Sequence, residues 1–115
     1  MDCFASKVEL KHKNWINIRY LLDSGVQYGL MTDHPVTPAR NLLMQTRWFI
    51  RAGLSKQQAV ELISRRNAEI LGIDRKLGTF RKGRWASFVC WNGDPFDLTK
   101  YPVAVFAEGS QIYPV

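Results

Sequence analysis

Residues 25–36, GVQYGLMTDHPV, place an acid and an imidazole at the end of a short apolar run. The run itself, residues 26–31, lies between Gly25 and Asp33 and has the length and composition of a strand buried on both faces. Strands of this kind belong to parallel sheets whose faces are covered by helices. The sequence therefore predicts a buried strand that ends at Asp33 and His34, before a proline-containing turn.

The stretch before this run predicts a helix over residues 14–24, NWINIRYLLDS. Asn14 is a good N-cap, and Gly25 can adopt the left-handed conformation that often ends a helix. Apolar side chains recur between them at helical spacing. A helix, a tight turn and a buried strand together make half of a βαβ unit.

Two further helices are predicted downstream. The first spans residues 38–51, because Pro38 suits the first helical position, where its missing N–H removes no hydrogen bond. The second spans residues 54–66 and begins with a capping box formed by Ser55 and Gln58. Its last two residues are arginines, which we expect at the negative end of the helix dipole.

The composition changes near residue 74, where a stretch rich in glycine and charge begins. Aromatic and β-branched runs separated by turn residues follow, and they predict strands. These elements are a strand at 85–91, a turn at 92–95, and a hairpin of 103–107 with 111–115.

The overall composition bounds the class of protein. A chain of 115 residues fits one small domain, and its 46% hydrophobic and 23% charged residues argue against disorder. No apolar stretch approaches the roughly 20 residues that span a bilayer, and the N-terminus lacks a signal-peptide layout. We expect a cytoplasmic protein without a membrane partner, in which Cys3 and Cys90 are free thiols.

The net charge of +6 raises the question of a nucleic-acid partner. The basic residues are spread along the whole chain, no nucleic-acid-binding motif accompanies them, and the aromatic residues lie in apolar runs. A solvated basic surface is therefore favoured, and a nucleic-acid-binding module is the least favoured function.

A single buried strand cannot stand alone, because its backbone groups need neighbouring strands. An isolated terminal hairpin is also only marginally stable in water. The sequence therefore predicts the end of something larger, which finds its missing partners upstream or by self-association.

Four segments in this order carry a family resemblance: GVQYGLMTDHPV (25–36), RAGLSKQQAVELISRRNAEILGI (51–73), LGTFRKGRWASFVCWNGDP (77–95) and VAVFAEGSQIY (103–113). Together they resemble the metal-dependent amidohydrolases, especially members close to imidazolonepropionase. The resemblance implies an α/β fold, namely the C-terminal fragment of a (β/α)8 barrel plus the closing strands of the flanking β-sandwich. Residues 1–73 would be the last barrel elements (helix, last barrel strand and following helices), and residues 74–115 the terminal strands of the sandwich.

The resemblance also assigns a role to Asp33. In this family the barrel holds one or two divalent metal ions, such as zinc or iron, at the C-terminal ends of its strands. The metal activates a water that attacks a C–N bond of a cyclic amide-like small molecule, and the aspartate after the last strand contacts the metal and handles the proton. Asp33 matches this position as the catalytic and metal-site residue. From the residues alone, a turn cap or an acceptor for backbone amides is the alternative.

The family's metal histidines have no counterpart in this sequence, whose only histidines are His12 and His34. One carboxylate and one imidazole fall short of the three protein ligands of a hydrolytic zinc, so we expect the isolated chain to be inactive and metal-free. His34, Lys7, Glu9 and His12 would lie at the mouth of the site. A turn residue and a solvated charge run are the alternatives for them.

Two functions follow from these observations. The first is a part of a metal-dependent amidohydrolase, present as a short separate chain or a truncated product. The second is a non-catalytic oligomerising remnant, or a partner subunit that completes another chain's barrel. Both predict a homo-oligomer or an upstream barrel-completing partner.

Overall fold

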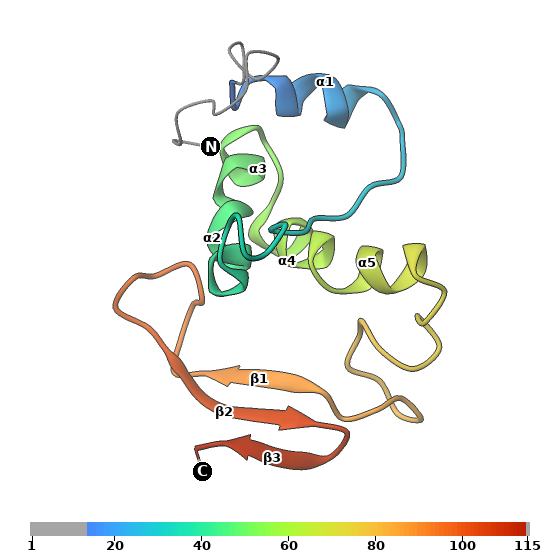
Figure 1. Cartoon of the computed structure of the whole chain (residues 1–115), viewed down its shortest axis with the longest axis vertical. Coiled ribbons are helices and arrows are strands. Elements are labelled where there is room, and N and C mark those ends of the chain that lie inside the picture. The colour runs from blue at the N-terminus through green and yellow to red at the C-terminus, as the bar shows by residue number, and fades with distance from the viewer. Residues whose placement is uncertain (1–13, 115) are drawn as a thin grey trace.

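The computed structural model describes residues 14–114 and places helices before strands (Figure 1). The helices gather beyond the β1 edge of a three-stranded sheet, and the C-terminus lies at the opposite edge. Within the described residues, no helix is long and apolar enough to span a membrane. The elements in chain order are α1 (Asn17–Asp23), η2 (Ala39–Asn41), α2 (Leu42–Gln45), α3 (Arg47–Arg51), α4 (Lys56–Leu62), α5 (Arg65–Ile70), β1 (Phe88–Trp91), β2 (Pro102–Ala107) and β3 (Ser110–Tyr113).

Helix α1 confirms the helix predicted before Gly25, with shorter bounds. The N-cap of α1 is Ile16 and not Asn14, so that part of the prediction is wrong: the Asn14 side chain instead accepts the Ile16 N–H at 3.1 Å in the turn ahead of the helix. Ile18 is buried at 3% exposure. Gly25 adopts φ +68°, the left-handed conformation that lets the chain leave the helix.

The strand predicted at residues 26–31 is wrong. The segment is extended but belongs to no sheet, and Val26 and Met31 are 60% and 77% exposed. In place of a neighbouring strand, Leu62 at the end of α4 accepts the Leu30 N–H at 3.2 Å. A strand needs an adjacent strand to form a ladder, and residues 14–114 place none beside this segment.

The single helix predicted at residues 38–51 is also wrong, because the structure divides it into η2, α2 and α3. Thr46 interrupts the path between α2 and α3. Its side chain is fully buried, and its hydroxyl donates to the Leu43 carbonyl at 2.6 Å. A threonine that bonds a carbonyl of the preceding turn offers the backbone an alternative to regular helix, which explains the break.

The capping box predicted for α4 is confirmed. The Gln58 N–H donates to the Ser55 hydroxyl at 3.2 Å, and the Ser55 N–H donates to the Gln58 side chain at 2.8 Å. Helix α4 nevertheless ends at Leu62, so the arginine pair expected at its C-terminal end opens α5 instead. Arg65 bonds Glu61 at 2.7 Å and Glu69 at 3.1 Å, and it thereby bridges the two helices.

The hydrophobic core lies between the helices and is small. Ile18, Phe49 and Leu62 form its buried centre, against which partly buried side chains of the segment around Tyr28 pack. The rings of Tyr28 and Phe49 stack with centroids 5.9 Å apart. Helix α1 and the extended segment are thus held to the helices that follow by apolar packing.

The sheet confirms the predicted terminal strands, with β1 starting later than expected. Its order is β1-β2-β3, with antiparallel pairing of Phe88 with Phe106 and of Ala107 with Ser110. Glu108 and Gly109 have φ +50° and +89°, as in the two-residue hairpin turns that match the twist of the strands. The strands of this half of the chain could therefore be predicted from local sequence.

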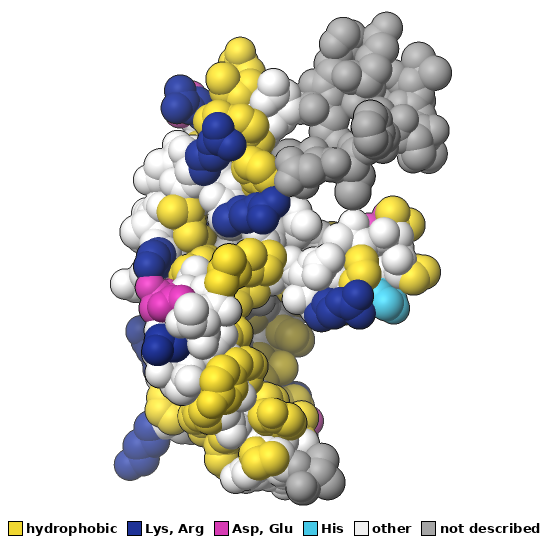
Figure 2. Space-filling model, turned by 90° about the vertical axis from the view of Figure 1, so that its left-hand side faces the viewer, with side chains coloured by type: hydrophobic (Ala, Val, Ile, Leu, Met, Phe, Trp, Pro, Cys, Tyr) yellow, Lys and Arg dark blue, Asp and Glu magenta, His cyan; other side chains and the backbone are white. Residues whose placement is uncertain are grey.

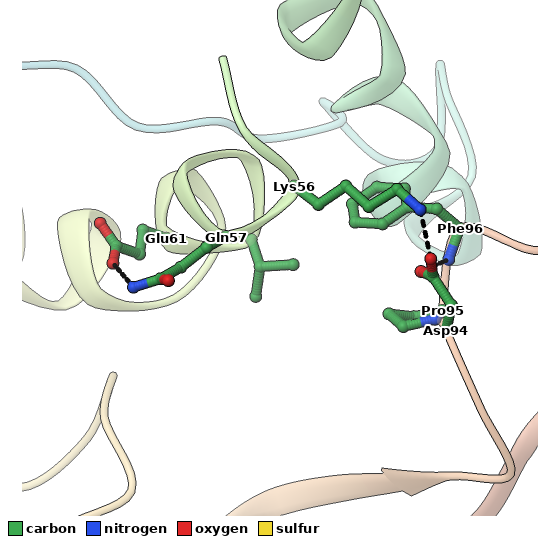
Figure 3. A pocket seen from close by; sticks show the side chains of 7 residues that line it. Lys56, Gln57, Glu61, Asp94, Pro95 and Phe96 are labelled. Carbon is green, nitrogen blue, oxygen red and sulfur yellow. Dashed lines mark hydrogen bonds and ion pairs between the residues drawn. The ribbon is translucent and has the colours of Figure 1, made fainter.

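Two contacts join the sheet to the helices. Gly78, in the loop before the sheet, packs so closely on α5 that an added Cβ would lie 2.6 Å from the Cβ of Ala68. On the other side, Lys56 at the start of α4 forms an ion pair with Asp94 in the turn after β1 (Figure 3). Asp94 also accepts the Phe96 N–H at 2.9 Å. Both hydrogen bonds, that of Lys56 foremost, lower the pKa of Asp94.

We expect Gly78→Ala to lower the free energy of unfolding by about 2–4 kcal/mol, the sum of left-handed backbone strain and overpacking. Gly83→Ala is the matched control, because Gly83 has a similar φ of +85° but open space around its Cα. The control should cost only the strain, about 1–2 kcal/mol. Urea unfolding measures both values, and equal losses would exclude the close contact with α5.

Asp94 should make stability depend on pH. Its folded pKa lies below the ordinary 3.8, so the unfolded chain binds the proton more tightly. Its stabilisation is therefore complete above 3.8 and is lost as the pH falls from there through the folded pKa. We expect Asp94→Asn to flatten the loss of urea stability in this range, and Asp23→Asn, an exposed control at the end of α1, to leave it steep. An unchanged slope in Asp94→Asn would contradict the ion pair.

Candidate functional site

The turn that carries Asp33 is sharply bent. Asp33 adopts φ +58°, unusual for a non-glycine residue, and its carbonyl accepts the Val36 N–H at 2.9 Å. The neighbouring His34 accepts the Ala39 N–H on Nδ1 at 3.4 Å, at the start of η2. Asp33 and His34 are both exposed, so the turn presents the carboxylate and the imidazole at the surface.

The segment that leads into this turn is fastened to helices α4 and α5. The Leu30 N–H donates to the Leu62 carbonyl, and the Leu30 carbonyl accepts from the Asn67 side chain at 2.8 Å. Both backbone groups of Leu30 are therefore paired with the helical layer. The anchor lies three residues ahead of Asp33.

The residues of this turn do not by themselves fit a hydrolytic metal centre. Such a centre usually has three protein ligands, and residues 14–114 contain no cluster of three or more His, Cys, Asp or Glu side chains suited to a metal ion. The structure brings together Asp33 and His34, which are adjacent in sequence. Lys7, Glu9 and His12, predicted at the site mouth, lie outside the described residues.

A second feature is a hollow beside the Lys56–Asp94 ion pair, about 330 Å³ in volume (Figure 3). Its walls are largely apolar and include Val60, Pro95 and Phe96. The Lys56 ammonium lies 5.9 Å from the centre of the Phe96 ring, so it makes a cation–π contact with the ring as well as the ion pair with Asp94. We interpret this hollow as part of the contact between α4 and the turn after β1.

A second hollow, of about 410 Å³, lies in the loop at residues 80–86 and is lined by Arg81, Lys82 and Arg84 among others. The Arg84 guanidinium donates to the Leu77 carbonyl at 3.2 Å, which braces the loop. This hollow contains no acid, histidine or cysteine. It therefore lacks the groups that a hydrolytic site needs.

No role was predicted for the anchoring residue Asn67, which lies in the segment at 51–73 that carries the family resemblance, or for the ion-pairing residues Lys56 and Asp94. The partners of these bonds are 37 and 38 residues apart, beyond the reach of any periodicity or local motif. A glycine inside an otherwise apolar extended run, at Gly29, was the available hint, since such a glycine often marks a close approach of another group.

Comparison with known proteins identifies the family. The profile described as the amidohydrolase family matches residues 3–113, nearly the whole chain. The chain is 27% identical over 111 residues to the amidohydrolase tasK of Hapsidospora irregularis, a match that covers 93% of this chain and 11% of that protein.

The fold gives the same answer. The structure of an amidohydrolase from Thermotoga maritima MSB8 matches with a TM-score of 0.87 and 32% identity, over 96% of this chain and 29% of that one. The chain thus spans well under half the length of either relative. Its sequence and its fold agree over almost all of its residues, and the chain belongs to the amidohydrolase family.

Proposed function

We propose that this chain is the C-terminal part of a metal-dependent amidohydrolase that hydrolyses a C–N bond in a cyclic amide-like substrate. The observation that carries the proposal is the match to 29% of a solved amidohydrolase with a TM-score of 0.87. A close fold match over a minor share of the relative is expected of a portion of that architecture.

In this proposal residues 1–73 are the last elements of a (β/α)8 barrel and residues 74–115 are the closing strands of a β-sandwich. The segregation of the elements supports it, because α1 to α5 precede the sheet (Figure 1). The extended segment before Asp33 would be the last barrel strand. It lacks a ladder here because the strands that would flank it are not among residues 14–114.

Asp33 is the residue of this chain that we assign to the reaction. Barrel enzymes place their catalytic groups in the loops that follow the strands, and Asp33 follows the extended segment in such a turn. Its carboxylate would take a proton from the attacking water and return it to the leaving nitrogen. A divalent metal, zinc or iron, would need further ligands from outside this chain, because Asp33 and His34 do not suffice.

His34 would lie at the rim of the same site. Its Nδ1 accepts the Ala39 N–H, so in the neutral ring the proton is on Nε2. The imidazole can then offer a donor to a substrate carbonyl near Asp33, while its bond to Ala39 fixes the ring.

A second function has separate support, namely a partner subunit or oligomerising remnant. Among the described residues sixteen large hydrophobic side chains are exposed, whereas five hydrophobic residues are buried. Figure 2 shows hydrophobic side chains gathered on the lower part of one face, over the sheet. Exposed apolar surface of this extent is typical of an interface.

Replacing Asp33 tests the enzymatic proposal. In the complete enzyme, with all strands of the barrel, we expect Asp33→Asn to lower kcat on a panel of cyclic amides by about 10²–10⁴, the usual loss on removing a general acid–base. Asp23→Asn, an exposed carboxylate on α1, is the matched control and should keep full activity. Unchanged turnover by Asp33→Asn would remove Asp33 from the mechanism.

Light scattering tests the association. We expect the purified chain to be a dimer or larger, because burying exposed apolar side chains against a second copy is favourable. Val103→Lys, on the exposed part of β2, should weaken the assembly more than Tyr20→Lys on α1 if the sheet is the interface. A monodisperse monomer would argue against this function.

A further inference from the structure

A hydrogen bond between Asn67 and the extended segment joins two distant parts of the sequence, three residues before Asp33. The Asn67 side-chain amide donates to the Leu30 carbonyl at 2.8 Å, across 37 residues of sequence. Its carboxamide lies directly over Gly29: a Cβ added there would lie 1.8 Å from the Asn67 Oδ1 and 2.9 Å from its Cγ.

Gly29 is therefore needed for space and not for backbone conformation, because a side chain at this position would push the Asn67 carboxamide away from Leu30. Its φ lies outside the left-handed range in which glycine is favoured, unlike Gly25 on the same segment. Any other side chain at position 29 would overlap with the carboxamide. The two residues form one unit, in which Gly29 lets Asn67 reach the backbone of Leu30.

Asn67 is itself held firmly. It is the third residue of α5, and the preceding Arg65 bonds Glu61 of α4 and Glu69 of α5, which fixes the two helices relative to each other. The neighbouring Arg66 places its guanidinium 5.5 Å from the centre of the Tyr28 ring, on the same extended segment. The support for Asn67 comes from α4 and α5 and not from the turn at Asp33.

The bonds of Leu30 lie close enough to Asp33 in the chain to affect where the Asp33 turn is held. Leu30 is the last residue before the Asp33 turn whose two backbone groups bond the helical layer, through Leu62 and Asn67. Beyond it, the next backbone bond is the Asp33–Val36 bond inside the turn. We therefore expect the bonds of Leu30 to determine the path of residues 31–32, and with it the position of the Asp33 carboxylate.

We propose that Asn67 is a positioning residue for Asp33, which holds the Leu30 carbonyl and so fixes the turn that carries the carboxylate relative to α4 and α5. This inference rests on the proposed role of Asp33 in the amidohydrolase reaction. It assigns to the helix that follows the site, rather than to a neighbouring strand, the control of where the acid lies.

Asn67→Asp is the sharpest variant, because it keeps the shape over Gly29 and removes the donor at neutral pH. In the full chain, hydrogen exchange followed by NMR should show the Leu30 amide exchanging at least about tenfold faster, because the bond from this amide to the Leu62 carbonyl opens more often once Asn67 no longer holds the Leu30 carbonyl. The Asp33 and Val36 amide resonances should shift, while the amides of β1 and β2 keep their rates. Asn17→Asp, the same change in the first turn of α1, is the matched control and should leave Leu30 unchanged.

Two results would overturn the proposal. Unchanged exchange at Leu30 would mean that the bond does not hold the segment, and a uniform rise at all amides would make Asn67 a general stabilising residue. Lowering the pH gives a rescue, because the carboxyl introduced by N67D becomes a donor when protonated. The Leu30 and Asp33 resonances should then return toward their wild-type positions, and a failure to return would also count against the proposal.

A variant pair covers the case in which N67D does not fold. Gly29→Ala should lower the unfolding midpoint strongly in the wild type but little in Asn67→Ala, where the carboxamide is gone. Equal effects in both backgrounds would refute the unit of Gly29 and Asn67.

Activity separates this inference from the proposed function. In the complete enzyme N67D should lower kcat with little change in KM, since it displaces the acid and not the substrate. If Asp33→Asn retains full turnover while N67D still frees Leu30, the reaction assignment fails and the anchor stands. If Asp33→Asn abolishes turnover but N67D leaves kcat unchanged, the positioning role fails alone.

Discussion

The pairing of the Leu30 backbone with two helices is the interaction on which the rest of the helical half depends. The partly buried Leu30 must satisfy its backbone N–H and C=O groups, and here the Leu62 carbonyl and the Asn67 amide do so in place of a neighbouring strand. This fastening brings Tyr28 onto Phe49 and closes the small core that contains Ile18. The segment thereby stays in place without a sheet around it.

The two halves of the chain are stabilised by different means. The sheet relies on backbone ladders and on contacts between aromatic rings: Phe88 meets Phe80 edge to face at a centroid distance of 4.9 Å and stacks on Phe106 at 4.8 Å. The helical half relies on packing around a few buried side chains and on the Glu61–Arg65–Glu69 bridge. The close packing of Gly78 on α5 and the Lys56–Asp94 ion pair connect the two halves.

Sequence reasoning succeeded where the cause of a structure lies within a few residues. The capping box at Ser55, the left-handed Gly25 and the turn at Glu108 and Gly109 are local, and all were predicted. The strand at 26–31 and the unbroken helix at 38–51 were wrong, because a ladder needs neighbours and because a buried hydroxyl diverted the helix. Asp33 was assigned by resemblance to a family, whereas the contact of Asn67 was not predicted because its partner lies 37 residues away.

The overlap of Gly29 with Asn67 has a consequence for how relatives of this chain can diverge. A side chain at position 29 would displace the carboxamide of Asn67 from Leu30, and asparagine at position 67 can reach the Leu30 carbonyl in this way only while position 29 is glycine. Substitutions at the two sites are therefore coupled, since a side chain at position 29 costs the Asn67–Leu30 bond only while asparagine is present at position 67. Among homologues these positions should vary together, and glycine at 29 should accompany asparagine at 67 more often than their separate frequencies would give.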